Sequence, residues 1–158
     1  MRRNDREVTK PSDIWSILKK CDVCHLAFAV ENTPYIVPMN FGFEVIDEQS
    51  ILYFHCAKQG KKLDMLEENN QVCFEADCFP KLIEAETACN CSMEYESVIG
   101  NGKMKVLTDL SEKTKAMNCI MNHYSNRTDF TYRENAINAI CILKLEVDSV
   151  TGKRNIPR

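Results

Sequence analysis

The feature of this sequence that most restricts its fold is a series of short stretches with alternating apolar and polar residues, joined by short polar turns. Between residues 139 and 147, for example, Leu143 and Leu145 point to one face of a strand while Lys144 and Glu146 point to the other. Strands that follow one another through short turns pair antiparallel, whereas parallel strands need long crossover connections. We therefore expect a mainly β fold, an antiparallel sheet or barrel with peripheral helices, in preference to a doubly wound parallel sheet.

The alternation and the turn residues together predict six strands and three helices. Asp109, with Glu112 three residues later, forms a capping box that starts the longest helix. Residues 81–90 fit neither pattern. The expected strands cover residues 24–30, 35–42, 51–56, 71–79, 95–107 and 139–147, and the expected helices begin after Pro11, near Lys61 and after Asp109.

Pro38 lies in the middle of an expected strand. Proline has no N–H to donate to a ladder, so this strand should lie at an edge, at a bulge, or where another group contacts the backbone. Asn40 follows two residues later, and the stretch could offer backbone and amide groups to a planar heterocycle. An edge strand beside a turn explains the same residues without any ligand.

The chain has 158 residues, about the size of one domain, so we expect residues 1–158 to form a single domain. Apolar residues make up 44% and charged residues 27%, as in an ordinary globular protein. The formal net charge is only −3, and no long block of like charge is present. A nucleic-acid partner is therefore a poor hypothesis, because phosphate backbones are bound by clustered lysine and arginine.

The sequence contains nine cysteines, an odd number in a chain well above mini-protein size. No apolar leader segment follows the charged N-terminus, and no run of about 18 apolar residues occurs, so we expect a cytoplasmic protein with reduced thiols and no membrane contact. Cys21, Cys24 and His25 have the spacing of a metal-ligand group, but no second ligand pair follows at the usual distance. We expect buried thiols here and no metal site.

The segment that points most directly to a ligand is Gly60-Lys61-Lys62, at the start of an expected helix. Lysines are unfavourable beside the positive end of a helix dipole unless an anion is present. Free N–H groups, a glycine that permits close approach and two ammonium groups would together bind an anion. His55 precedes this segment and could hydrogen-bond the same ligand. The alternatives are that both lysines face solvent and that His55 is structural.

Motifs that would give the chain its own catalytic machinery are missing. The sequence has no nucleophile motif, no paired carboxylates, no dinucleotide-binding glycine fingerprint and no phosphate-binding P-loop. If the protein is an enzyme, its chemistry is expected to come from a cofactor.

Five segments in a fixed order carry a resemblance to a known family. They resemble the pyridoxamine 5′-phosphate oxidase-like flavoproteins, in particular the branch related to the nitroimidazole-resistance (Nim) proteins, and the likeness covers nearly the whole chain. The segments are residues 34–42 (PYIVPMNFG), 52–57 (LYFHCA), 60–62 (GKK), 72–75 (VCFE) and 97–102 (SVIGNG).

The resemblance implies a six-stranded antiparallel split β-barrel that forms a homodimer, with FMN bound at the subunit interface by both chains. One group of residues would line the flavin ring, a second would run along the flavin to its phosphate, a third would bind that phosphate, and a fourth would approach from the partner subunit. In that order, the groups are Val37, Pro38, Met39, Asn40 and Phe41; His55, Cys56 and Ala57; Gly60, Lys61 and Lys62; and Ser97 and Val98.

By the same resemblance, His55 is the best candidate for a catalytic residue. The chain departs from the family pattern at Cys56, where serine is frequent, and this weakens a hydroxyl contact to phosphate. The function implied is an FMN-dependent oxidoreductase that reduces small electron acceptors such as nitroaromatics. The alternative is a non-catalytic flavin or haem binding or sensor protein of the same fold.

Overall fold

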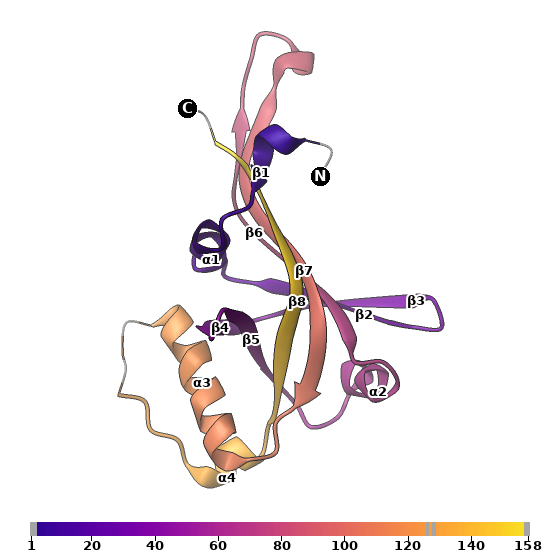
Figure 1. Cartoon of the computed structure of the whole chain (residues 1–158), viewed down its shortest axis with the longest axis vertical. Coiled ribbons are helices and arrows are strands. Elements are labelled where there is room, and N and C mark those ends of the chain that lie inside the picture. The colour runs from indigo at the N-terminus through magenta and orange to yellow at the C-terminus, as the bar shows by residue number, and fades with distance from the viewer. Residues whose placement is uncertain (1–2, 126, 128, 157–158) are drawn as a thin grey trace.

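The computed structural model describes residues 3–156 apart from 126 and 128, and its strands form a single strongly curved antiparallel sheet (Figure 1). The strands are β1 (Glu7–Val8), β2 (Cys24–Val30), β3 (Thr33–Met39), β4 (Phe41–Ile46), β5 (Gln49–Cys56), β6 (Gln71–Ile83), β7 (Ser92–Val106) and β8 (Cys141–Asn155). The helices are α1 (Pro11–Leu18), α2 (Lys61–Glu68), α3 (Leu110–Tyr124) and α4 (Glu134–Asn138), with short 3₁₀ turns at Asn4–Arg6 and Ala88–Asn90.

The order of strands explains why the sheet closes on itself. Neighbours in the sheet run β3-β2-β6-β7-β8-β5-β4, with β1 added to β8. The two strands at the ends of this order, β3 and β4, are consecutive in the chain and are separated by Asn40 alone. The sheet must therefore curl until its two edges meet at Asn40, which gives the split β-barrel that the family resemblance implied.

A tyrosine at the end of α3 connects the two sides of this junction. The Tyr124 hydroxyl accepts a hydrogen bond from the Phe41 N–H at 3.0 Å and donates one to the Asp22 carbonyl at 2.8 Å. Phe41 begins β4, and Asp22 lies two residues before β2. The backbone N–H at the start of an edge strand is thereby satisfied by a side chain.

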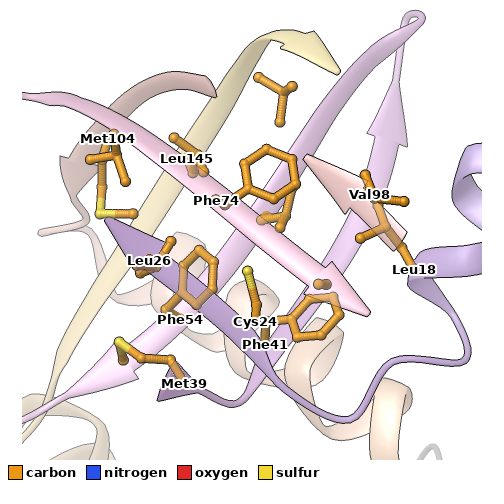
Figure 2. Close-up of a cluster of buried hydrophobic side chains, with 14 of the residues drawn as sticks. Leu18, Cys24, Leu26, Met39, Phe41, Phe54, Phe74, Val98, Met104 and Leu145 are labelled. Carbon is orange, nitrogen blue, oxygen red and sulfur yellow. The ribbon is translucent and has the colours of Figure 1, made fainter. Parts of the chain in front are cut away.

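The main core fills the inside of the curved sheet, and Figure 2 shows its central side chains. Inward-facing residues of successive strands supply it because side chains alternate along a strand. Its fully buried aromatic members are Phe28, Phe41, Phe54 and Phe74. Helix α1 adds Ile14, Ile17 and Leu18 to the same core.

A second, smaller core lies on the outside of the barrel, under α3 (Figure 1). Outward-facing Ile51 and Tyr53 of β5 and Ile142 of β8 pack there against Ala116 and Ile120 of the helix. At this point α3 approaches β4 so closely that a Cβ added to Gly42 would lie 2.5 Å from the helix backbone. A residue larger than glycine would push the helix away from the sheet.

The expected mainly β class is confirmed, but the described residues form eight strands instead of the expected six. The stretch expected as one strand over 35–42 is divided at Asn40, and the two-residue strand β1 carries too short a pattern to recognise. Residues 81–90 belong mostly to a hairpin in which β6 and β7 extend beyond the body of the protein (Figure 1). Helix α4 has only five residues and was also missed.

Of the three positions that the sequence allowed for Pro38, the structure shows the edge strand, since β3 ends the sheet order. The predicted cap of α3 is confirmed as well, because the Asp109 side chain accepts a hydrogen bond from the Glu112 N–H at 2.9 Å. Within the part of the chain that the structure describes, each helix is too short or too polar to cross a bilayer.

Candidate functional site

The predicted anion-binding segment lies where β5 passes into α2. Strand β5 ends at Cys56, the four residues 57–60 form an exposed loop, and α2 begins at Lys61. Gly60 is the N-cap and has φ 140° and ψ 160°, a region that only glycine occupies readily. The Gly60 carbonyl accepts hydrogen bonds from the N–H groups of Leu63 and Asp64, but the cap has no side chain, so the N–H groups of Lys61 and Lys62 have no partner within the helix.

The two lysines differ in their surroundings. Lys61 is exposed, and its ammonium group lies 4.8 Å from the centre of the Tyr35 ring on β3. Lys62 is half-buried and close enough to Cys141 of β8 for its charge to act on that thiol. The Lys61 contact brings α2 against the strand that carries Val37 and Pro38, so two segments predicted to bind one ligand are neighbours in space.

On β3 and β4, the residues predicted to line a flavin ring alternate in direction. Pro38 and Asn40 are exposed, and Val37 is half-buried. Met39 and Phe41 point into the main core (Figure 2). Any contact of Met39 and Phe41 with a ligand is thus limited to backbone atoms, and the Phe41 N–H is already bonded to Tyr124.

The remaining predicted residues also include both exposed and buried side chains. His55 and Ala57 are exposed, while Cys56 is half-buried and faces Cys141 of β8. On β7, Ser97 points outward and is half-buried, but the side chain of Val98 is fully buried in the chain's own core (Figure 2). Of Val98, only backbone atoms therefore remain for the predicted contact with a ligand of the partner subunit.

A cavity of about 570 Å³ lies beside α2, between that helix and strands β7 and β8. Lys58 and Gln59 of the loop before α2 line it, together with Cys141 of β8 and Lys113 of α3. His55, Lys61 and Lys62 are not among its lining residues. The sequence did not indicate this cavity because its walls come from segments far apart in the chain.

One group of side chains on the outer face could share a metal ion. His25 of β2 lies opposite Glu75 of β6, with Nδ1 3.3 Å from Oε2, and Asp77 follows on the same face. One ligand atom from each residue lies within 4.8 Å of the others. Burial and then the charge of Asp77 raise the pKa of Glu75, and His25 only partly offsets this. Strand pairing alone brings the three together, so spacing along the chain could not reveal them.

The sequence profile of the pyridoxamine 5′-phosphate oxidase family matches residues 10–154 of the chain. No curated protein sequence matches it. Among solved structures, a candidate 5-nitroimidazole antibiotic resistance protein from Bacteroides thetaiotaomicron is 36% identical, with 93% of this chain and 85% of that chain covered and a TM-score of 0.81.

Two more distant structures have the same fold. The FAD and heme binding protein from Mycobacterium smegmatis is 17% identical, with coverages of 96% and 74% and a TM-score of 0.80. An FAD-binding protein from Mesorhizobium loti is 20% identical, with coverages of 96% and 98% and a TM-score of 0.67. At such low identity the likeness extends to the fold alone.

Proposed function

Because this chain belongs to the pyridoxamine 5′-phosphate oxidase family, we propose that it binds FMN and uses it to reduce small electron acceptors such as nitroaromatic compounds. The observation that carries the proposal is the start of α2, where Gly60 in a glycine-only conformation precedes Lys61 and Lys62. Unpaired N–H groups, the positive end of the helix dipole and two ammonium groups make this a site for a phosphate monoester.

The neighbouring strand supports a planar ring next to that phosphate. Lys61 contacts Tyr35, so the helix start lies beside β3. As an edge strand, β3 has backbone groups on one side that no other strand uses. Pro38 and Asn40 expose their side chains at this edge, while Val37 points to the opposite face and is exposed only in part. These residues would hold the flavin ring and orient it.

His55 and Ala57 are exposed on the path from the strand to the phosphate site. The His55 imidazole can donate or accept one proton at a ligand atom, so we assign it the contact with the flavin or the acceptor. When bound, the flavin supplies reversible electron transfer, and the protein supplies orientation and electrostatics. The similarity to a candidate 5-nitroimidazole resistance protein supports a nitroaromatic acceptor.

The proposed protein is a cytoplasmic homodimer with FMN at the subunit interface. Strands β3, β2, β6 and β7 share an outer face on which Ile36 is 63% exposed and Ile99 is 51% exposed. Ser97, assigned to the partner's flavin, points from the same face two residues before Ile99. A second copy would cover these apolar side chains and bring Ser97 to the site. Nine unpaired cysteines are in keeping with a reducing compartment.

The proposal is tested by the visible spectrum of the purified protein and by identification of the released cofactor. We expect flavin absorption and released FMN; after chemical reduction, a nitroimidazole should reoxidise the flavin. Released FAD would replace FMN as the cofactor, and a Soret band would favour the haem-binding alternative. A colourless protein that takes up no flavin would refute the proposal.

Replacing both Lys61 and Lys62 with alanine should weaken FMN binding by roughly 2–4 kcal/mol, treating each as a charge-assisted contact and discounting for non-additivity. Fluorescence titration of the apoprotein with FMN measures the effect. The comparison pair is Lys58→Ala with Lys113→Ala, which removes the same charge from the lining of the cavity beside α2. An effect of the comparison pair alone would move the phosphate into that cavity.

A further inference from the structure

Two cysteines face each other on neighbouring strands next to the proposed flavin segment. Cys56 ends β5 and Cys141 begins β8, and the two are direct partners in the antiparallel register. Direct partners point their side chains to the same face of a sheet. Both thiols therefore lie on the inner face, at the end of the β5–β8 ladder.

This placement suits a covalent bond between the two sulfur atoms. Directly opposed residues in an antiparallel pair have Cα atoms about 4.5 or 5.5 Å apart, depending on their hydrogen bonding. A disulfide requires a Cα separation of about 4.4–6.8 Å. The Cα separation of the pair thus falls in the range that a disulfide needs, and the Cys56 thiol is close enough to affect Cys141 directly. The 84 residues between the two cysteines hide the pair from a reading of the sequence.

The two thiols differ in accessibility and in charge environment. Cys56 is half-buried, and Cys141 is buried but lines the cavity beside α2 together with Lys58 and Lys113. Burial, and then the adjacent Cys56 thiol, raise the pKa of Cys141 to about 11, against the opposing effect of Lys113 and Lys62. Because a reagent in solution reaches the half-buried Cys56 more readily than the buried Cys141, Cys56 is the better first nucleophile and Cys141 the resolving thiol.

We propose that Cys56 and Cys141 form an oxidation site, a dithiol that low-molecular-weight disulfides convert to an intrachain disulfide. The Cys56 thiolate attacks one sulfur of the reagent RSSR, which forms a mixed disulfide and releases one RSH after protonation. The Cys141 thiolate then attacks the Cys56 sulfur and releases the second RSH. In total, two cysteine thiols and RSSR give one protein disulfide and two RSH, so the protein loses two hydrogen atoms and two electrons.

A second thiol pair shows that accessibility to a reagent determines which pair can be oxidised. Cys21 and Cys78 also lie within contact of each other, but both are buried in the main core. A reagent in solution cannot reach them without local unfolding. The site proposed here needs no bound flavin, although its product would fix the strand end from which residues 57–60 lead to Lys61.

The experiment treats the fully reduced full-length protein with oxidised glutathione at mildly alkaline pH, blocks remaining thiols with iodoacetamide, and maps the peptides by mass spectrometry. We expect a peptide pair joined through Cys56 and Cys141, near-complete loss of alkylation at both, and restoration of both by dithiothreitol. Wild-type protein alone gives this result, so it does not depend on whether a variant folds.

Variants identify the order of the two steps. Cys141→Ser should stop at the glutathione mixed disulfide on Cys56, and Cys56→Ser should leave Cys141 largely alkylated. Cys73→Ser removes an exposed thiol on the outer face of β6 and should leave the disulfide unchanged. A wild-type protein that keeps glutathione on Cys56 without closing the disulfide, or that alkylates fully at both positions, would overturn the proposal.

Discussion

Two parts of the outer face of the same sheet differ in whether a helix of the chain covers them. On β5 and β8, the outward-facing Ile51, Tyr53 and Ile142 are at most 4% exposed because α3 covers them. On β3 and β7, the outward-facing Ile36 and Ile99 are more than half exposed. The alternation of each strand supplied an apolar outward residue in both places, but the chain provides a helix for only one of them. The uncovered part is where we place a second copy.

The carboxylates on the two parts also differ, in the direction of their pKa shifts. Under α3, Glu44 accepts a hydrogen bond from the Tyr53 hydroxyl at 2.7 Å and pairs with Lys115 at 2.9 Å. Burial alone would raise the pKa of Glu44, but Lys115 and Tyr53 outweigh it and lower that pKa. On the uncovered part, burial and Asp77 raise the pKa of Glu75. The negative charge of Glu44, under α3, is thus compensated by neighbouring groups, whereas that of Glu75, on the uncovered part, is not.

The largest effect on folding should come from the covered part. Ile142→Ala should reduce the free energy of unfolding by about 2–5 kcal/mol, because it leaves a cavity under α3. The matched change Ile99→Ala should alter it by less than about 0.5 kcal/mol in dilute monomeric protein. Urea denaturation followed by circular dichroism measures both. Equal losses would mean that the two parts of the face are covered alike.

Association should respond in the opposite way. Ile99→Glu should weaken dimerisation by roughly 2–4 kcal/mol, because it would bury another carboxylate beside Glu75, the direct partner of residue 99 on β6, in the proposed interface. Sedimentation velocity over a range of concentrations measures this. Ile46→Glu, the same substitution at the exposed end of β4, is the control and should leave association unchanged. A dimer that withstands Ile99→Glu would place the interface elsewhere.

The junction between the two ends of the sheet should show an intermediate effect. Tyr124→Phe keeps the ring but leaves the Phe41 N–H without its partner, while the Asp22 carbonyl keeps only the longer hydrogen bond from the Asn40 amide at 3.5 Å. This change should cost about 1–3 kcal/mol of unfolding free energy. Hydrogen exchange should show faster exchange of the Phe41 amide. Unchanged exchange at Phe41 in the variant would show that the hydroxyl does not hold this junction.

The smallest predicted effects have opposite signs. Glu44 has a lowered pKa in the folded protein, so its contribution to stability is present at neutral pH and is lost as pH falls through that pKa. Glu44→Gln should therefore destabilise the protein at pH 7 by about 1–2 kcal/mol, and less in acid. Glu75 has a raised pKa, so it favours folding in acid and opposes folding as pH rises through that pKa.

Glu75→Gln should consequently stabilise the protein at pH 7, by less than about 1 kcal/mol because solvent screens this partly exposed group. The gain in stability of the Glu75→Gln variant over the wild type should disappear as pH falls and the wild-type carboxyl takes up a proton. Denaturation curves of both variants and the wild type between pH 4 and pH 7 test the signs together, with about 4.3 as the ordinary glutamate pKa. The same sign for both variants at pH 7 would contradict the comparison.

The sequence predicts the strands with long alternation and the helix with a capping box, because those signals are local. It cannot show that Asn40 divides one stretch into two strands, since both halves carry the same alternation. The glycine and lysines before α2 were recognisable from their order in the chain. By contrast, strand pairing alone joins Cys56 to Cys141 and His25 to Glu75, and pairing across 50 or more residues leaves no local trace.

The single residue between β3 and β4 also restricts how the sheet can misalign. A strand that slips by one residue against its neighbour turns every side chain to the opposite face. Here a slip of β3 along β2 would pull on β4 through Asn40 and draw Phe41 out of the core, so both edges must shift together or neither can. The single-residue connection at Asn40 therefore fixes the register of both edge strands. A one-residue insertion there is the change that would allow one edge strand to slip without the other.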